Sequence, residues 1–354
     1  MSMLDDLARM RTCDPGGMHE HLEGFPGQLR EAERVGRGTP LTVRSDGIGA
    51  VAVVGMGGSA IGGELAAGYL AGSLSVPLSV VRDYSLPAWV GPSTLVYVSS
   101  YSGNTEETLS AYAEARERGA KIVCSTTGGE VGRIAAETGH DVVRVPGGFP
   151  PRAALGFGLV PLLVVLGRLG LAPDPADDVR DAILVMEEGV RRLGLAVPSA
   201  GNEAKELASW FFGRVPVIYG AAPGTSVVAN RWCGQFSENS KVVAHRNELP
   251  EMNHNEIVGW SGTLTMGGEA RVLFLRGEDD HPRVVRRMDI TREAIAATGV
   301  EVRSATSRGK TWLGRLMSLV QLGDFVSFYL AMLAEVDPTP VTPIDKLKRE
   351  LARL

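Results

Sequence analysis

The sequence predicts an α/β protein in which two doubly wound parallel-sheet domains are joined by a helical segment. Short apolar, β-branched segments alternate with helical patterns, which is typical of parallel strands covered on both faces. A strand, a turn and a helix occur at 51–70 and again at 215–236, which indicates two domains of one kind. We expect the first domain at 1–155, the helical segment at 156–210 and the second domain at 211–354.

The first domain is expected to begin with a helix and loop over His19–Thr42 and to continue with five strands. A helix is predicted over Ile61–Leu70. Another is predicted over Glu106–Arg118, whose acidic first turn and basic last turn complement the helix dipole. A stretch rich in Pro and Gly, Pro146–Pro151, closes the domain. The five strand candidates are Val51–Val54, Leu78–Val81, Leu95–Val98, Lys121–Cys124 and Val142–Val145.

The second domain follows a mostly helical segment over about 155–212. Val215–Tyr219 is expected to form its first strand, and Gly220–Gly224 the turn after it. A helix rich in small residues comes next. Later strands are predicted at Arg271–Arg276 and Val300–Arg303.

Charge and composition restrict the class of partner. The chain has 354 residues, with 36 Lys and Arg against 41 Asp and Glu, so its net charge is −5. Without a basic surface, we expect no nucleic-acid or membrane partner. Three cysteines cannot form a disulfide framework, which favours a reducing compartment. The N-terminus is too charged for a signal peptide, and the apolar run Leu155–Leu166 is too short to span a bilayer. We therefore expect a cytoplasmic protein.

The first segment suited to anion binding is Gly55–Gly63, with the sequence G-M-G-G-S-A-I-G-G. It lies directly between a strand and a helix, where glycines let the backbone approach an anion and N–H groups at the helix start can face a phosphate. A dinucleotide fingerprint would need G-x-G-x-x-G, and residues 55–60 run G-M-G-G-S-A, so that site is disfavoured. The alternative is a tight turn with close helix packing.

The second segment is Ser99–Thr108, with the sequence S-S-Y-S-G-N-T-E-E-T. It also connects a strand end to a helix, and its hydroxyls at Ser100, Ser102 and Thr105 could bind one phosphate. The alternative is a helix N-cap, and both roles can hold at once. Because open α/β sheets bind ligands at the carboxyl ends of their strands, two such turns predict an anion site at that edge.

The third segment carries groups suited to acid–base chemistry. Glu238 lies in Gln235–Ser240, and His254 lies further along in the polar segment Asn247–Ile257. Moving a proton between two neighbouring carbon atoms requires a base, and opening a ring that contains an acetal oxygen requires an acid–base pair. A carboxylate and a histidine suit these two tasks near neutral pH. The alternatives are a surface histidine and a carboxylate that pairs with Arg231 or Lys241.

These segments carry two resemblances. The first two segments resemble the loops of the sugar isomerase (SIS) domain, which hold a sugar phosphate. The segment E-L-P-E-M-N-H-N-E-I resembles the bifunctional phosphoglucose/phosphomannose isomerase family, and the similarity extends over Val53–Gly63, Ser99–Thr108, Pro150–Gly156 and Leu319–Lys348. The resemblance implies two SIS domains over nearly the whole chain, with the phosphate loops in the first and the E-L-P-E-M-N-H-N-E segment in the second.

The resemblance also implies roles for individual residues. Glu238 would be the proton-transfer base, and Arg152 would stabilise the enediolate. His254 would open the ring from the other subunit of a homodimer with a shared active site. A lysine near the C-terminus would assist it, for which we select Lys348, with Lys346 the next choice. The phosphate would be held by Gly58, Ser59, Ser100, Ser102 and Thr105.

We therefore expect an isomerase that interconverts glucose 6-phosphate, and mannose 6-phosphate, with fructose 6-phosphate. An enediol route requires no metal or organic cofactor, and six scattered histidines give no metal cluster. One alternative is a non-catalytic SIS sugar-phosphate sensor, which would not need Glu238 or His254. It would keep the hydroxyls of Ser59, Ser100, Ser102 and Thr105. Another is a different isomerase or amidosugar enzyme on the same fold.

Overall fold

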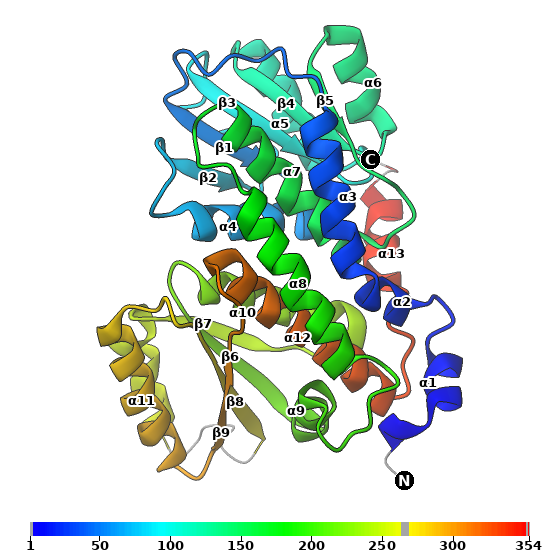
Figure 1. Ribbon diagram of the computed structural model, residues 1–354, viewed down its shortest axis with the longest axis vertical. Coiled ribbons are helices and arrows are strands. Elements are labelled where there is room, and N and C mark those ends of the chain that lie inside the picture. The colour runs from blue at the N-terminus through cyan, green and yellow to red at the C-terminus, as the bar shows by residue number, and fades with distance from the viewer. Residues whose placement is uncertain (1–2, 263–268, 352, 354) are drawn as a thin grey trace.

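The computed structural model of the chain describes residues 3–262, 269–351 and 353. It contains two parallel sheets, one above the other in Figure 1, with helices packed between them. The strand order is β2-β1-β3-β4-β5 in the first sheet and β7-β6-β8-β9 in the second, and every pairing is parallel. The predicted α/β class with two doubly wound parallel sheets is confirmed.

The predicted strands are present with small shifts at their ends. The first sheet contains β1 (Ala50–Val54), β2 (Leu78–Val81), β3 (Thr94–Ser99), β4 (Lys121–Thr126) and β5 (Asp141–Arg144). The second sheet contains β6 (Val215–Ala221), β7 (His245–Leu249), β8 (Ala270–Arg276) and β9 (Glu301–Thr306). Strand β7 was not expected, because its polar sequence H-R-N-E-L lacks an apolar pattern. It is an edge strand, and most of its side chains are accessible, so it does not need an alternation of apolar residues.

The helices cover both faces of each sheet. The outer face of the first sheet packs against α5 and α6, and that of the second against α11. Helices α3, α4, α7, α8, α9, α10 and α12 contribute to the core between the sheets. The helices are α1 (Leu7–Cys13), α2 (Met18–Glu23), α3 (Phe25–Gly38), α4 (Gly57–Leu70), α5 (Glu106–Glu117), α6 (Gly129–Thr138), α7 (Leu155–Arg168), α8 (Ala176–Leu193), α9 (Glu203–Phe211), α10 (Thr225–Gln235), α11 (Pro282–Ala296), α12 (Trp312–Leu333) and α13 (Thr342–Leu351).

One apolar core runs between the two sheets without interruption. Side chains from the inner face of the first sheet, such as Val53, belong to the same buried cluster as Leu273 on the second sheet. Helices α8 and α12 lie within this cluster. Because the core crosses the expected boundaries, the division at 1–155, 156–210 and 211–354 stays a prediction.

Helix α12 is the most apolar long element of the core. By length and composition it could cross a membrane, but 89% of its most apolar window is buried within the protein, as in the core helix of a globular fold. Three polar side chains, Gln321, Asp324 and Ser327, are fully buried on it. Buried polar groups need partners, so these three positions identify where α12 makes specific bonds.

Two of these polar groups fix α10 and the turn after it. The Asp324 carboxylate accepts hydrogen bonds from Arg231 at 2.7 and 3.0 Å and from Gln235 at 2.8 Å. The hydroxyl of Ser327 accepts one from Asn239 at 2.9 Å. Arg231 also donates to the backbone oxygen of Arg152 at 2.9 Å, which connects this network to the end of the first sheet.

We predict that Asp324→Ala destabilises the fold by about 3–5 kcal/mol, because it leaves the Arg231 guanidinium buried without a counter-charge. Both side chains of this ion pair are at most 3% exposed. The control is Asp177→Ala, which removes an 88% exposed carboxylate paired with Arg180 and should cost less than about 1 kcal/mol. Urea denaturation measures both, and equal midpoints for the two variants would contradict the assigned role of Asp324.

Candidate active site

The two segments suited to anion binding meet at one edge of the first sheet. Strands β1 and β3 are neighbours at the point where the strand order reverses, which is where doubly wound folds bind ligands. The turn after β1 leads into α4, and the turn after β3 leads into α5. The Ser59 hydroxyl accepts a hydrogen bond from the backbone N–H of Tyr101 at 3.2 Å, so the two turns are in direct contact.

In the turn after β3, the hydroxyl of the N-cap residue does not cap α5. Thr105 occupies the N-cap position but makes no side-chain hydrogen bond to the helix. Its hydroxyl lies 3.4 Å from that of Ser100, which is a weak contact. Ser102 accepts a bond from the N–H of Asn104 at 3.2 Å and is exposed. The free N–H groups of α5 and these hydroxyls are therefore available to an anion.

Two glycines allow the turns to pack closely. Gly103 has φ +73°, and a Cβ there would lie 2.0 Å from the carbonyl oxygen of Gly128. A Cβ on Gly58 would lie 2.6 Å from the carbonyl oxygen of Pro151. The tight-turn interpretation is thus correct in part. The same close approach places the short 3-10 helix Pro151–Ala153, which carries Arg152, against the start of α4.

Glu238 lies on a π-helical turn, Phe236–Ser240, that continues directly from α10. Turns of this type occur often at functional sites, because the extra residue changes the direction of the side chains. Asn239 and Ser240 on this turn are buried and bonded to α12, whereas the Glu238 side chain is 32% exposed. Its carboxylate contacts Arg152 at 3.4 Å. The neighbouring Arg231 and Lys241 bind Asp324 and backbone carbonyls instead.

Arg152 is held in one orientation by neutral acceptors. Its Nε donates to Asn239 at 2.6 Å, and one terminal nitrogen donates to the carbonyl oxygens of Pro338 and Thr339 at 2.6 and 2.8 Å. The other terminal nitrogen faces Glu238. Burial lowers the pKa of Arg152, and the charge of Glu238 opposes that effect. A guanidinium stays protonated in proteins, so a fixed positive charge lies beside the Glu238 carboxylate.

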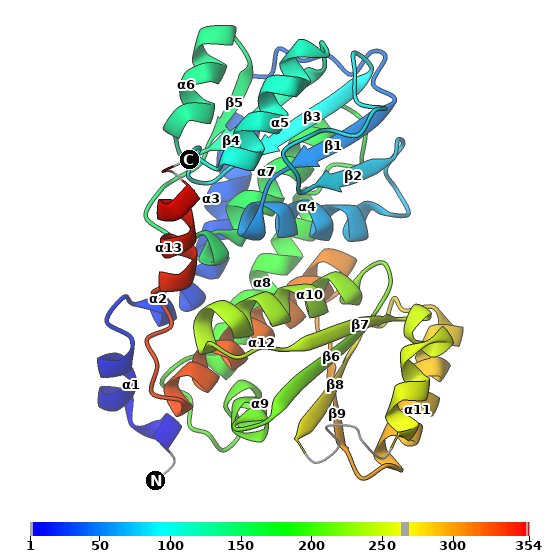
Figure 2. The same cartoon turned by 180° about the vertical axis from the view of Figure 1, so that it is seen from behind.

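Both groups line a pocket of about 220 Å³ between α4 and α10, helices that face each other between the sheets in Figure 2. Gly58 lines this pocket and also the small hollow of about 10 Å³ beside Ser59. The turn after β1, which the sequence predicts to bind phosphate, and the Glu238–Arg152 pair are thus neighbours. The pocket is lined by Gly57, Gly58, Ile61, Arg82, Arg152, Asn230, Arg231, Gly234, Gln235 and Glu238.

Several pocket residues were not expected from the sequence. Arg231 and Gln235 are one helical turn apart on α10, and Glu238 lies one turn further along. This spacing of polar residues on a buried helix was a usable signal for a shared polar face. Arg82 comes directly after β2 with nothing in the local sequence to single it out, and it pairs with Glu64 on α4 at 2.6 Å.

His254 and the C-terminal lysines do not reach this pocket within one chain. His254 ends the 3-10 helix Glu251–His254 and is exposed. Lys346 and Lys348 lie on α13, where every residue with a described side chain is exposed. The structure thus brings together Glu238, Arg152 and the turns after β1 and β3, and leaves His254 and Lys348 on the surface.

The corresponding edge of the second sheet is closed by an aromatic ring. A Cβ on Gly224, in the turn after β6, would lie 2.0 Å from the ring of Trp312. A Cβ on Gly277, directly after β8, would lie 3.4 Å from the same ring. The sequence after β8, Glu278–Asp280, is acidic and would repel a phosphate. Of the two repeated strand–turn–helix units, only the second therefore has the space beside its turn filled by an aromatic ring.

The groups gathered at the open site suit a phosphorylated, hydroxylated ligand. Hydroxyls and N–H groups of the turns can bind phosphate, and a carboxylate beside a guanidinium can move a proton and stabilise the anion that results. Within the described residues, no group of three or more His, Cys, Asp or Glu side chains is arranged to hold a metal ion.

Similar folds occur in known sugar-phosphate proteins. Tagatose-6-phosphate ketose/aldose isomerase from Escherichia coli superposes with a TM-score of 0.69 at 15% identity, over 92% of this chain and 95% of that one. A glucose-6-phosphate isomerase like protein from Thermus thermophilus superposes with a TM-score of 0.66 at 20% identity, over 96% of this chain and 98% of that one. At such identities the similarity supports the SIS fold alone.

Sequence similarity identifies the family. Residues 200–351 match the model of the bacterial phospho-glucose isomerase C-terminal SIS domain. The bifunctional phosphoglucose/phosphomannose isomerase of Caldicellulosiruptor bescii is 42% identical over 95% of this chain and 99% of its own length. The protein of the same name from Aquifex aeolicus is 40% identical over 84% of this chain and 89% of its own. The chain belongs to the bifunctional phosphoglucose/phosphomannose isomerase family, as the resemblance of its motifs implied.

Proposed function

We propose that this protein is an aldose–ketose isomerase that interconverts glucose 6-phosphate, and mannose 6-phosphate, with fructose 6-phosphate. The observation that carries the proposal is the 3.4 Å contact between Glu238 and Arg152 in a pocket beside the phosphate turns. The names of its relatives support the same activity. A base, a fixed cation and a phosphate site are the components that an enediol reaction needs.

The geometry supports a division of roles at the reacting carbons. The Glu238 carboxylate takes the proton from C2 of the open-chain aldose and returns it to C1, and an enediolate forms in between. The hydroxyl proton of O2 passes to O1, so that C2 becomes the carbonyl carbon of the ketose. Arg152 stabilises the negative charge on the enediolate oxygens. Its contact with Glu238 is longer than an ordinary charge-assisted hydrogen bond, and its plane is fixed by three bonds to neutral acceptors. The cation is thus in position before the charge develops.

The phosphate of the substrate binds at the two turns of the first sheet. Gly58 and Ser59 contribute from the start of α4, and Ser100, Ser102 and Thr105 contribute from the turn before α5. Binding there places the sugar carbons toward Glu238, because Gly58 borders both the phosphate turn and the Glu238 pocket.

Ring opening is assigned to His254 and Lys348, with Lys346 as the alternative lysine. Their exposed positions on one chain support a homodimer in which these groups reach the partner's pocket. No metal or organic cofactor has a role in this reaction. We place the protein in the cytoplasm, without nucleic-acid or membrane partners, because of its acidic net charge and its small number of cysteines.

A coupled assay distinguishes the isomerase from a sugar-phosphate sensor. Purified protein with EDTA is given glucose 6-phosphate or mannose 6-phosphate, and the formation of fructose 6-phosphate is followed. Turnover on at least one of them is expected. Binding of these sugars without turnover would support the sensor instead.

Glu238→Gln tests the base. The amide keeps the size and hydrogen bonding of the side chain but cannot accept the C2 proton. We expect kcat to fall by about 10²-fold or more, with sugar-phosphate affinity retained. The exposed Glu206→Gln on α9 is the matched control and should leave kcat unchanged. A kcat near wild type in Glu238→Gln would remove this residue from the mechanism.

Thr105→Val tests the phosphate site. Because the Thr105 hydroxyl makes no capping bond, its loss should leave α5 intact while raising KM more than it lowers kcat. Ser102→Ala should behave similarly. Ser110→Ala, an exposed hydroxyl further along α5, is the control. Steady-state kinetics with melting curves measure both properties, and unchanged KM in Thr105→Val and Ser102→Ala would leave the turn with a structural role alone.

Mixing two inactive variants tests the shared active site. In an equal mixture of Glu238→Gln and His254→Ala subunits, about half the dimers are hybrids. If each site takes its base from one chain and its histidine from the other, a hybrid has one intact site of two. Activity should then recover to about a quarter of wild type. An inactive mixture, after subunit exchange has been confirmed by mass spectrometry, would place both residues in a site from one chain.

A further inference from the structure

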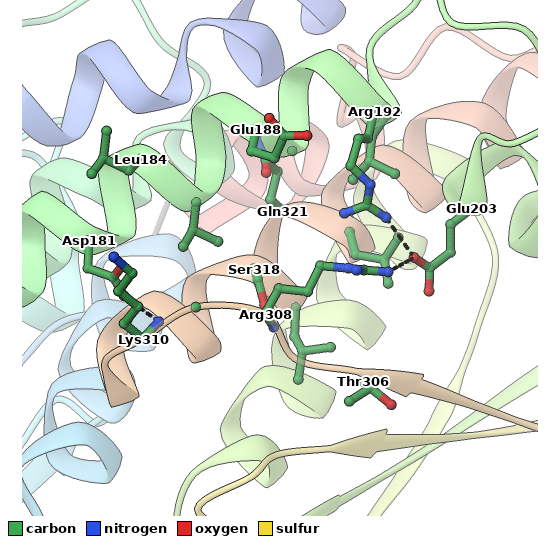
Figure 3. A pocket seen from close by; sticks show the side chains of 16 residues that line it. Asp181, Leu184, Glu188, Arg192, Glu203, Thr306, Arg308, Lys310, Ser318 and Gln321 are labelled. Atoms are coloured by element: carbon green, nitrogen blue, oxygen red, sulfur yellow. Dashed lines mark hydrogen bonds and ion pairs between the residues drawn. The ribbon is translucent and has the colours of Figure 1, made fainter.

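A second and larger pocket lies on the opposite side of α12 from the Glu238 site. It has a volume of about 420 Å³ and opens between α8, α12 and the segment directly after β9 (Figure 3). Small organic ligands are bound in pockets of about 300–1,000 Å³. This pocket shares no residue with the Glu238 pocket, and the proposed isomerase reaction gives it no role.

Most of the pocket wall is apolar. Leu184 and Val185 contribute from α8, and Leu319 and Leu322 contribute from α12. Leu184 is 57% exposed, which is unusual for a leucine that borders a concave apolar surface. The ring or chain of an organic ligand that covered Leu184 would bury this area and be stabilised by it.

One side-chain amide, that of Gln321, also lines this pocket. Gln321 is 2% exposed, and its amide N–H donates to the carbonyl oxygen of Met186 at 2.9 Å. Its side-chain oxygen accepts no hydrogen bond from any part of the chain that the structure describes. That oxygen lies over Gly189, where a Cβ would be only 1.8 Å away, so the glycine makes room for it. An amide oxygen at the wall of a pocket can accept a hydrogen bond, so this group is suited to an N–H or O–H donor of a ligand.

The charged residues at the rim are mostly paired with one another. Figure 3 shows Arg192 and Arg308 converging on Glu203, at 3.4 and 3.6 Å. Glu188 pairs with Arg191 at 2.6 Å. These contacts neutralise two of the three carboxylates that line the pocket.

The third carboxylate, Asp181, binds backbone N–H groups and not the side chain of Lys310. Asp181 accepts bonds from the backbone N–H groups of Lys310 and Thr311 at 2.9 and 2.8 Å. The Lys310 ammonium is exposed and has no partner among the residues that the structure covers. The pocket thus offers a positive charge on a flexible side chain at its mouth, together with the outer faces of two arginines.

We propose that this pocket binds a small organic anion that is not the sugar substrate. The ligand has an apolar ring that packs on Leu184, Val185 and Leu322, an N–H or O–H donor for the Gln321 oxygen, and one phosphate or carboxylate that reaches Lys310 and Arg308. A nucleoside monophosphate and an aromatic carboxylate both have this chemistry.

Isothermal titration of the whole protein with three probes tests the proposal. Adenosine 5′-monophosphate and indole-3-acetate each carry a ring, an N–H donor and an anion, and inorganic phosphate carries the anion alone. We expect a Kd of about 1 mM or lower for at least one of the first two, and weaker binding of phosphate. Which of the two binds decides between phosphate and carboxylate.

Amino-acid substitutions test whether the probe binds in the pocket between α8 and α12. Leu184→Trp fills the pocket from an exposed position, and Lys310→Glu reverses the free charge. Each should weaken binding by about tenfold or more. Arg180→Glu makes the same charge change on α8 outside the pocket and should leave the Kd unchanged. Thr105→Val should also leave it unchanged, which separates this pocket from the phosphate turns.

Two outcomes would overturn the proposal. One is a failure of both ring-bearing probes to bind to folded protein. The other is binding that survives both Leu184→Trp and Lys310→Glu, or that is lost in Thr105→Val. Neither outcome depends on turnover, so the isomerase proposal stands or fails separately.

Discussion

The buried ion pair between Arg231 and Asp324 is the interaction on which the arrangement of the site depends. Asp324 lies near the centre of α12, the long apolar helix of the core, and Arg231 spans from it to the backbone of Arg152. Taking two charges out of water is costly, and the cost is offset only when every donor and acceptor is satisfied. Here the geometry is bidentate, and Gln235 adds a further bond to the carboxylate. These bonds can all form only when α10, α12 and the turn that carries Arg152 are in one position relative to each other.

The Arg231–Asp324 ion pair determines which cation lies beside Glu238 in the pocket. Because Arg231 is committed to Asp324, it is unavailable to Glu238, whose carboxylate faces Arg152 alone among the described cations within salt-bridge distance. Arg152 in turn is fixed by neutral carbonyl and amide oxygens, so its charge is not cancelled within the core. A partly exposed carboxylate beside an incompletely neutralised guanidinium is an arrangement that serves a reaction better than it serves stability.

The two sheets are both parallel and doubly wound, but the turns at the carboxyl ends of their strands differ. In the first sheet, glycines and hydroxyls leave backbone N–H groups open at the point where strand order reverses. In the second, the Trp312 ring occupies the same position, and the residues after β8 are acidic. The second sheet instead contributes α10 and its π-helical turn, which place Glu238 in the same pocket as Gly58 in the turn after β1. The continuous core between the sheets, in which α12 takes part, keeps these two contributions in register.

The sequence alone determined the parallel α/β class, the alternation of strands and helices, and the positions of the two turns that we predict to bind an anion. Each of these is a local property, since β-branched runs, glycines and hydroxyls act within a few residues of themselves. It also singled out Glu238, Arg152 and His254 through their motifs, which lie within the similarity to the family.

Only the tertiary structure decided which of these groups meet. Glu238 and Arg152 are 86 residues apart in the chain, and their contact depends on a core that packs two sheets against the same helices. Strand β7 was missed because an edge strand need not show an apolar pattern. The role of Asp324 was missed because its ion-pair partner, Arg231, lies on another helix far away in the sequence. Such partners are set by packing over long separations, and no local pattern records them.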